Sequence, residues 1–318
     1  MGRMKNFVPE GVIPATLLAF NDDFSIDEAE TRRHLSHVAS VDGISAITVN
    51  GHSSEIHACN FEEQVRILDV TMDEIGDRIP VINGVYADGS LEAARIAKMA
   101  EAGGASALLC FPPHSLGMGG VRHRPEMAHA HFATIADATD LPLIVFQYSD
   151  DTAYALDTLV ALAENIPSIK AIKDWSPPQV HERHIRVLQN LPRPINVLST
   201  NSAWLMSSLV MGAKGLLSGA GSVIAALQVD LFRAVQAGDL PRARDISDRM
   251  WHATNAFYAD PFGDMHNRMK EALVIQGLQD RAVVRPPLVK LTDAEIGRIA
   301  DALEAAGLLE EGARAAAE

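Results

Sequence analysis

Short apolar segments alternate with longer amphipathic segments along most of this 318-residue chain, and this alternation limits the possible folds. Eight segments have the length and apolar character of buried strands, and they cover residues 11–20, 43–51, 79–86, 106–113, 142–148, 169–175, 195–200 and 215–221. Segments with helical periodicity lie between them, for example residues 88–102 and 125–138. Eight β/α units in series predict an α/β fold, the (β/α)8 TIM barrel.

A doubly wound parallel sheet is the alternative arrangement of the same units. The glycine pattern G-x-G-x-x-G does not follow the first predicted strand, which weakens a dinucleotide-binding interpretation. Three further helices are predicted at residues 240–258, 264–276 and 293–306, and residues 283–291 join the last two. We expect one structural unit, with a barrel formed by residues 1–236 and C-terminal helices in residues 237–318 packed on it. The final segment EEGARAAAE is expected to fray.

The charge balance limits the classes of partner. The chain has 27 basic and 41 acidic residues, a net charge of −14. Nucleic-acid binding requires clustered Lys and Arg, so a nucleic-acid partner is not expected. The chain shows neither an apolar run of membrane-spanning length nor a signal-peptide core, so no membrane association is expected. Cys59 and Cys110 form no C-x-x-C pair, and a reducing cytoplasm is the expected location.

The predicted sixth strand, SIKAIKDWS (168–176), contains a lysine where an apolar residue would be expected. One explanation is that the Lys173 stem lies along apolar surface while its amine stays in water. The position of Lys173 in the chain favours a second explanation, a role in an active site. In a TIM barrel the C-terminal ends of the strands form the active-site face, and Lys173 lies near such an end. Apolar surroundings lower the pKa of a buried amine, and a neutral amine forms Schiff bases with carbonyl compounds.

Six motifs occur in an order that is familiar from a known family: GVIPATLLAF, NGHSSE, FPPHS, SIKAIKDWS, MGAKGLLSGAGSV and MKEALVIQGLQDRAVVRPPLVKL. Together they resemble the dihydrodipicolinate synthase/N-acetylneuraminate lyase family of Schiff-base aldolases, over residues 12–291. The resemblance implies a class I lyase that acts on pyruvate or a related 2-oxo acid, without a cofactor or a metal. It also implies a homotetramer, and we expect Met118 to lie near a subunit contact.

The resemblance assigns roles to individual residues, with Lys173 as the amine that forms the iminium. The loop NGHSSE stands where the family has G-T-T-G-E, with Gly51 and Glu55 matching. The resemblance implies that this loop holds the substrate carboxylate through the residues that follow Gly51, namely His52, Ser53 and Ser54. Successive backbone amides and a short hydroxyl form an anion-binding nest, although an ordinary helix-entry turn has the same residue types.

The glycine-rich motif SGAGSV contributes Ser218 and Gly219, which the resemblance places in the substrate site. Two other interpretations remain open for this motif. Glycines after the last strands of a TIM barrel often bind phosphate, and glycine also permits close packing at the barrel rim.

Departures from the family pattern concern the proton-transfer residues. Phe146 stands where the family has its catalytic tyrosine, and Tyr148 lies two residues further on, on the same strand face. Tyr148 either supplies the phenol from a shifted position or bonds to backbone. His52 replaces the relay threonine, and His114 replaces the second tyrosine of P-Y-Y. Imidazoles titrate near neutrality, so Tyr148, His52 and His114 are candidate catalytic residues beside Lys173.

Asp151 stands where dihydrodipicolinate synthases have the arginine that holds the carboxylate of the aldehyde substrate. An anion at this position repels an anionic second substrate. We therefore expect a divergent family member that does not serve lysine biosynthesis. A neutral or sugar-derived aldehyde suits Asp151 better, and an amine-bearing partner is a further possibility.

Two other patterns concern metal binding and the protein surface. His181 and His184 have i, i+3 spacing, but no third ligand is evident, so an exposed or outer-helix role is expected. The segment DMHNRMKEAL (264–273) is expected to be a solvated or interface helix face. A metal-dependent aldolase is the enzymatic alternative and requires converging ligands. A non-catalytic 2-oxo acid or sugar-acid binding protein is the alternative from another class, because Phe146 and Asp151 depart from the family pattern.

Overall fold

The computed structural model describes residues 4, 7–117, 120–148 and 151–309. Met118 and the segment EEGARAAAE lie outside the described residues. Eight parallel strands form one sheet in the order β1-β8-β7-β6-β5-β4-β3-β2. The strands are β1 (Gly11–Pro14), β2 (Ile47–Val49), β3 (Val81–Val85), β4 (Ala107–Cys110), β5 (Leu143–Gln147), β6 (Ile169–Asp174), β7 (Asn196–Ser199) and β8 (Gly215–Ser218).

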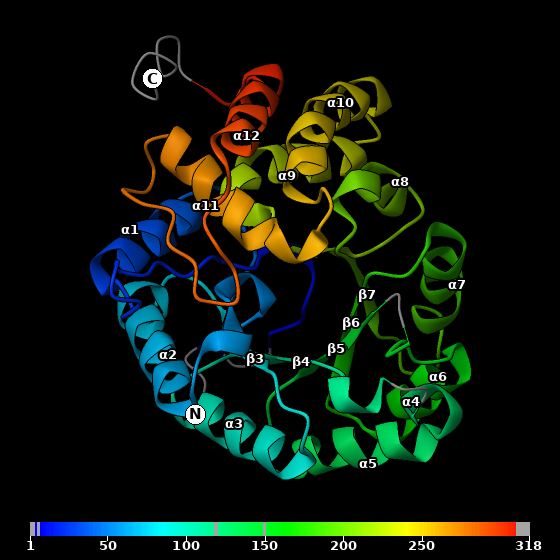
Figure 1. The fold of residues 1–318 in the computed structure, drawn as a ribbon. Helices are drawn as coiled ribbons and strands as arrows, with labels where there is room; N and C mark the ends of the chain where they lie inside the picture. The colour runs from blue at the N-terminus through cyan, green and yellow to red at the C-terminus, as the bar shows by residue number, and fades with distance from the viewer. Residues whose placement is uncertain (1–3, 5–6, 118–119, 149–150, 310–318) are drawn as a thin grey trace.

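Backbone hydrogen bonds between the first and second strand segments close the sheet. The Ser45 amide donates to the Val12 carbonyl at 2.9 Å, and the Thr16 amide donates to the Thr48 carbonyl at 2.9 Å. The strands therefore enclose a barrel with helices around it (Figure 1). The prediction of a (β/α)8 barrel is confirmed, and the doubly wound alternative is wrong.

Helices surround the barrel and continue beyond its last strand. The helices are α1 (Glu28–Ala39), α2 (Phe61–Ile75), α3 (Ser90–Ala102), α4 (Gly120–His123), α5 (Pro125–Ala136), α6 (Leu156–Asn165), α7 (Pro178–Leu188), α8 (Leu205–Val210), α9 (Gly221–Gln236), α10 (Leu240–Phe257), α11 (Met265–Ile275) and α12 (Asp293–Ala305). Short 3₁₀ helices follow several strands, and they are η1 (His52–Ser54), η2 (Ile56–Ala58), η3 (His114–Leu116), η4 (Ser202–Trp204) and η5 (Phe262–Asp264).

The observed strands are shorter than the apolar runs that predicted them. The first run, residues 11–20, contains a strand only over Gly11–Pro14. Leu17, Leu18 and Phe20 lie beyond this strand and are at most 3% exposed. Apolar character follows burial, and the loops at this end of the barrel are themselves buried, so the pattern overestimates strand length.

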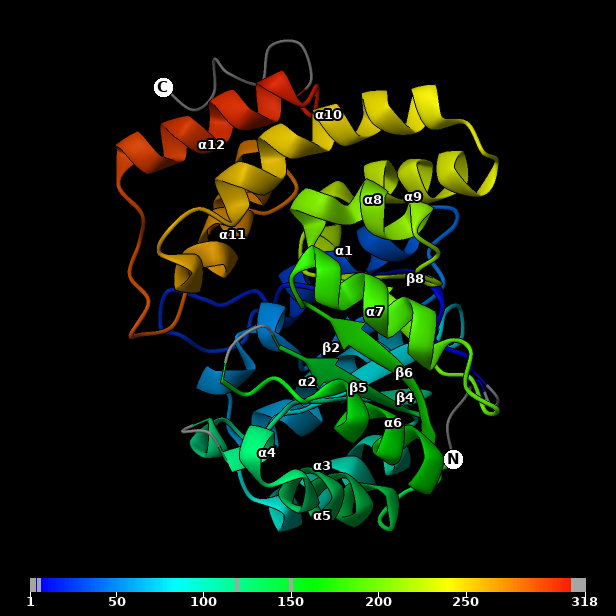
Figure 2. The same cartoon turned by 90° about the vertical axis from the view of Figure 1, so that its right-hand side faces the viewer.

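The last three helices pack beside the barrel, where α10 lies on α8 and α9 and α12 lies on α10 and α11. Figure 2 shows α10 and α12 running across the molecule with α11 beneath them. The expectation that segment 264–273 is a solvated or interface helix face is wrong, because every residue from 265 to 273 is already buried within the single chain. Its charged side chains have partners that permit this burial. Lys270 forms a salt bridge with buried Glu55, and Arg268 donates to the Ala259 carbonyl at 2.6 Å.

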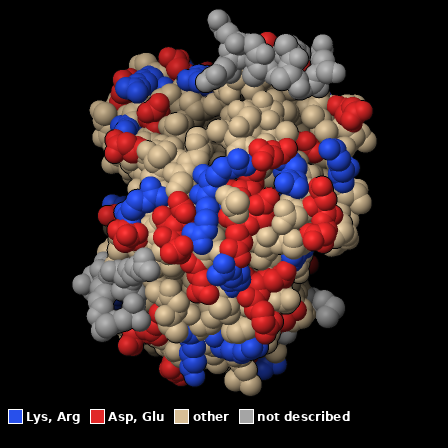
Figure 3. Space-filling view, turned by 90° about the vertical axis from the view of Figure 1, so that its left-hand side faces the viewer, with Lys and Arg blue, Asp and Glu red and all other residues tan. Residues whose placement is uncertain are grey.

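The outer surface over the N-terminal helices carries charges of both signs. On the face shown in Figure 3, Lys and Arg side chains are interspersed with Asp and Glu side chains. Two ion pairs account for part of this pattern: Arg32 with Asp73 at 2.7 Å and Arg66 with Glu28 at 2.6 Å. Within the described part of the chain, no helix has both the length and the apolar character that a bilayer crossing requires.

Candidate active site

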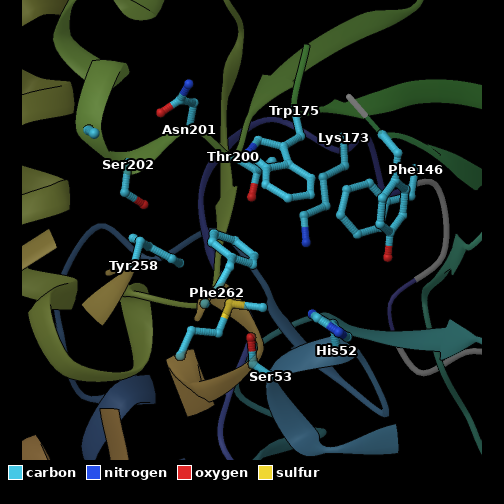
Figure 4. Close-up of a pocket in the computed structure, with 14 residues that line it drawn as sticks. His52, Ser53, Phe146, Lys173, Trp175, Thr200, Asn201, Ser202, Tyr258 and Phe262 are labelled. Atoms are coloured by element: carbon cyan, nitrogen blue, oxygen red, sulfur yellow. The ribbon is translucent and has the colours of Figure 1, made fainter. Parts of the chain in front are cut away.

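A pocket lies at the C-terminal ends of the barrel strands, next to the tail helices. It encloses about 640 Å³ of space that protein atoms do not fill, counting its open mouth. Five of the predicted site residues line it: His52, Ser53, Tyr148, Lys173 and Gly219. They come from separate parts of the chain, and the closed barrel brings them together. Figure 4 shows the Lys173 amine pointing into this space, with His52 and Ser53 on the opposite wall.

Lys173 is buried in β6 and is 5% exposed, whereas Lys170 on the same strand is exposed. Its partner in the neighbouring strand β5 is Phe146, and the Lys173 Nζ atom lies 4.0 Å from the centroid of the Phe146 ring. Burial lowers the pKa of Lys173 from 10.5 to about 7, because the charged ammonium loses its hydration. A large fraction of this amine is therefore neutral and nucleophilic near neutral pH.

His52 and Ser53 lie in η1, directly after β2, and Gly51 is the N-cap of η1. Burial, followed by the nearby Lys173, lowers the pKa of His52 to about 3, so its imidazole is neutral at physiological pH. Gly219 makes room for Ser53, because a Cβ atom on Gly219 would lie 2.4 Å from the Ser53 Oγ atom. Ser54 differs from these neighbours: its hydroxyl donates to the Thr16 carbonyl at 2.8 Å, and it does not line the pocket.

The loop that carries His52 and Ser53 rests on β3 at Gly84. A Cβ atom on Gly84 would lie only 1.9 Å from the Asn50 carbonyl oxygen, which is a prohibitive overlap. Asn50 itself has a left-handed backbone, with φ of 51°, and its side chain donates to Asn83 at 2.8 Å. Only glycine on β3 permits this close approach of the loop.

Three hydroxyl groups gather near the ends of β7 and β8. The Ser202 and Ser218 Oγ atoms are 2.8 Å apart, and Tyr258 interacts with both. The Tyr258 hydroxyl also accepts a hydrogen bond from the Ala220 amide at 3.1 Å. Ser218 is 1% exposed and reaches the pocket through Ser202 and Tyr258, which both line it (Figure 4).

Aromatic rings form the wall on the β5 side. Tyr148 and Phe146 have ring centroids 4.3 Å apart, which confirms that these residues share a face. The Tyr148 ring meets His114 edge-on at 5.3 Å, and His114 also contacts Tyr86 at 5.4 Å. His114 therefore lies behind the pocket wall, next to Tyr148, and does not line the pocket itself.

Asp174 follows Lys173 and points to the other side of β6, where it accepts hydrogen bonds from two histidines. The Nδ1 atoms of His181 and His184 lie 2.8 and 2.7 Å from its Oδ2 atom, and the His181 Nε2 atom lies 2.7 Å from the Ser208 Oγ atom. Burial would raise the pKa of Asp174, but the hydrogen bonds from both histidines outweigh burial and lower it.

The expectation that His181 and His184 are exposed is therefore wrong, although both lie on the outer helix α7. The helix turns their shared face inward, where the buried carboxylate pairs with them. The order Ser208, His181 and Asp174 has the geometry of a hydrolytic triad. Ser208 is 0% exposed and His181 is 2% exposed, so a substrate cannot reach this hydroxyl, and the network fixes α7 and α8 against β6.

A separate group of histidines lies at the side of the pocket. His52, His57 and His266 each offer one ring nitrogen, and these nitrogens lie within 4.8 Å of one another. The sequence did not reveal this convergence, because His266 is more than 200 positions away in the chain. These three residues have the donor atoms that could hold a metal ion.

Comparison with known proteins gives a family. The model of the dihydrodipicolinate synthetase family matches residues 8–306. The chain belongs to this family. The 4-hydroxy-tetrahydrodipicolinate synthase of Neisseria meningitidis serogroup B is 28% identical over 306 residues, which cover 94% of this chain and 99% of the relative. The enzyme of the same name from Methanopyrus kandleri is 28% identical over 314 residues, which cover 96% of this chain and 99% of the relative.

Solved structures of the dihydrodipicolinate synthase family share the fold. YagE, a prophage protein from Escherichia coli K12 crystallised with pyruvate, has a TM-score of 0.86 and 21% identity, and covers 95% of this chain and 100% of its own. A monomeric dihydrodipicolinate synthase variant also has a TM-score of 0.86 and 21% identity, and covers 94% of this chain and 97% of its own. The family membership places the chain among lyases of the class I aldolase kind.

The two residues at which this dihydrodipicolinate synthetase family member departs most from the family pattern lie in different places. Asp151 is exposed and does not line the pocket. Phe146 lines the pocket and leaves the position of the family tyrosine without a hydroxyl. Tyr148, directly after β5, is the residue that brings a phenol to this side of the pocket wall.

The sequence analysis missed the wall that the C-terminal segment forms. Trp175 stacks on Phe262 at 4.8 Å, and Phe262 stacks on Tyr258 at 5.6 Å. Met265 completes this side of the pocket. These residues follow the barrel in the chain, and only a three-dimensional arrangement shows that the tail returns to the strand ends. Aromatic residues at the ends of the predicted helices were the available clue.

Proposed function

We propose that the protein is a class I lyase that forms a Schiff base between Lys173 and pyruvate or a related 2-oxo acid. The observation that carries this proposal is the buried Lys173 amine in the pocket at the strand ends, with its pKa lowered to about 7. Membership of the dihydrodipicolinate synthetase family supports the same reaction type.

The proposed chemistry begins when the neutral Lys173 amine attacks the ketone carbon. The carbinolamine then loses its oxygen as water and becomes an iminium, which draws electrons from the adjacent C–C or C–H bond. Ser53 and the backbone amides of its loop bind the substrate carboxylate, with Gly51 opening the turn. The neutral imidazole of His52 offers one donor and one acceptor to the substrate.

Protons move on the β5 side in this proposal. Tyr148 lines the pocket, and His114 contacts its ring, so the pair can exchange a proton with the substrate and pass it toward the surface. The hydroxyls of Ser202 and Tyr258, supported by Ser218, face a second substrate on the opposite wall. A neutral or sugar-derived aldehyde matches these hydroxyls, and Asp151 does not offer the cation that would hold an anionic second substrate.

Reductive trapping tests the amine. Incubation with pyruvate and borohydride should add a permanent mass to the intact protein, and peptide mapping should place it on Lys173. Lys173→Arg should abolish the adduct, because a guanidinium stays protonated. Lys170→Arg is the matched control, because Lys170 is exposed on the same strand, and it should leave trapping unchanged. An adduct on another lysine, with Lys173→Arg still active, refutes the mechanism.

A non-catalytic 2-oxo acid binding protein is the second candidate, and the observation that favours it is Phe146 at the tyrosine position. Binding without turnover of any 2-oxo acid and aldehyde pair would support this second candidate. Turnover that Lys173→Arg abolishes would support the lyase.

We also propose a homotetramer, in keeping with the family resemblance. Light scattering at micromolar protein concentration should give four times the mass of the 34.3 kDa chain. A monomer at that concentration would contradict the proposal. The monomeric variant among the structural neighbours shows that a protein with this fold can also be a monomer.

A further inference from the structure

Two short helices after β2 and the first turn of α11 bring three histidines together. His52 lies in η1, His57 in η2 and His266 in α11. The ring centroids of His52 and His266 are 4.7 Å apart, and those of His57 lie 6.2 and 6.1 Å from the other two. One nitrogen of each ring lies within 4.8 Å of the others.

We propose that His52, His57 and His266 form a binding site for a divalent transition-metal ion of the zinc class. Imidazole nitrogen is a preferred ligand of such ions. Zinc–nitrogen bonds of about 2.1 Å in a tetrahedral site place the nitrogens about 3.4 Å apart. The present spacing of up to 4.8 Å requires the nitrogens to approach by up to about 1.4 Å, and His57 is the exposed member of the three.

A metal ion binds the neutral form of each ring, so the protonation of these histidines matters to the site. Burial lowers the pKa of His266 well below its ordinary value and lowers that of His52 to about 3. A neutral imidazole keeps the lone pair that binds the ion. The same low basicity makes a proton relay through these rings a weaker interpretation, because a relay needs groups that protonate near neutral pH.

One buried nitrogen of His266 lacks a hydrogen-bond partner in the described part of the chain. His266 is 1% exposed, and its Nδ1 atom has no hydrogen-bond partner among the residues that the structure describes. An unpaired buried polar atom is costly, and coordination of one ring nitrogen would fix the tautomer and orientation of the ring. The nearby Lys270 ammonium does not exclude a cation, because its charge is paired with Glu55.

The site has a consequence for the pocket, because His52 also lines it. A bound ion would fix the His52 ring and occupy one of its nitrogens. The site itself does not depend on the Schiff-base proposal, since Lys173 is not one of its ligands.

Cobalt(II) and zinc(II) test the site in the full-length protein after chelator treatment and dialysis. We expect one cobalt ion per chain, with visible absorption from nitrogen coordination, and zinc should raise the unfolding temperature. His57→Ala removes the exposed ligand and should weaken binding about tenfold or more and abolish the zinc-dependent rise. His37→Ala is the matched control, an exposed histidine on α1 outside the cluster, and should bind as the wild type does.

Either of two results overturns the proposal: no stoichiometric cobalt binding by the wild type, or equal binding by His57→Ala. Loss of pyruvate trapping with intact cobalt binding would refute the Schiff-base proposal alone. Intact trapping without cobalt binding would refute the metal site alone.

Discussion

At the residue scale, two opposing effects act on the Lys173 amine. The Phe146 ring at 4.0 Å favours the charged ammonium, and such contacts contribute about 0.5–2 kcal/mol. Burial favours the neutral amine, and a pKa that falls from 10.5 to about 7 corresponds to roughly 5 kcal/mol. Burial is the larger effect, so it determines the protonation state of Lys173. The Phe146 ring, at the position of the family tyrosine, offsets part of this effect.

The lowered pKa predicts the pH dependence of Schiff-base formation. Below pH 7 the amine is mostly protonated, so the initial rate of pyruvate trapping should rise with pH and level off above about 7. Trapped mass against time at fixed pyruvate measures this rate, and Lys170→Arg should show the same midpoint. A rate that continues to rise toward pH 10 would show that Lys173 keeps the basicity of an exposed lysine.

The sequence was sufficient to predict that Lys173 lies at the active-site face, because the strand that carries it is the sixth of eight β/α units and the lysine lies near its C-terminal end. It was not sufficient for His181 and His184. Their spacing shows that they share a helix face, but not that the face turns toward Asp174. The cluster around His266 was also beyond sequence reasoning, because helical periodicity does not say which loop a distant helix will contact.

At the scale of elements, the pocket loop depends on the backbone of β3. The loop that carries His52 and Ser53 approaches Gly84 so closely that no side chain fits between them. The apolar pattern predicted that β3 exists, but a glycine within a strand pattern has several explanations. Only the position of the Asn50 carbonyl shows that this glycine receives the loop.

Gly84→Ala should displace this loop and leave the barrel folded. A shift of about 1 Å in a binding group can cost about a hundredfold in rate, so we expect pyruvate trapping to slow by that order. Gly89→Ala is the matched control, because a Cβ atom there has no neighbour within 4 Å. Trapping rates together with unfolding temperatures check both variants, and wild-type trapping by Gly84→Ala would contradict the role of the close contact.

At the scale of the whole molecule, the tail is tied to the barrel through the same loop. Lys270 of α11 pairs with Glu55, and the Arg285 amide donates to the other Glu55 oxygen at 3.0 Å. The Arg285 side chain donates to the Phe24 carbonyl at 2.7 Å and to Glu63. The end of the loop that carries His52 and Ser53 is therefore held between β2 and the tail.

Removal of one partner from the buried ion pair should destabilise the protein strongly. Lys270→Met leaves the Glu55 carboxylate buried without its cation, and we expect a loss of about 3–5 kcal/mol in the free energy of unfolding. Denaturant unfolding measures this loss. The double variant Glu55→Gln, Lys270→Met should recover part of the stability.

Arg66→Met is the control for this prediction, because the Arg66–Glu28 pair is largely exposed and should contribute little. If Lys270→Met and Arg66→Met have the same free energy of unfolding, the buried Lys270–Glu55 pair does not stabilise the contact between the tail and the barrel.

The stack of Trp175, Phe262 and Tyr258 joins the end of β6 to the C-terminal segment. Two different parts of the chain therefore form the pocket, and this has a consequence for its evolution. The amine belongs to the barrel, whereas one wall of the pocket belongs to a segment almost a hundred residues later, with Tyr258, Phe262 and Met265. Substitutions at Phe262 or Met265 can reshape that wall without touching Lys173. In the lyase that we propose, such an arrangement allows a lineage to change its second substrate while it inherits the amine unchanged.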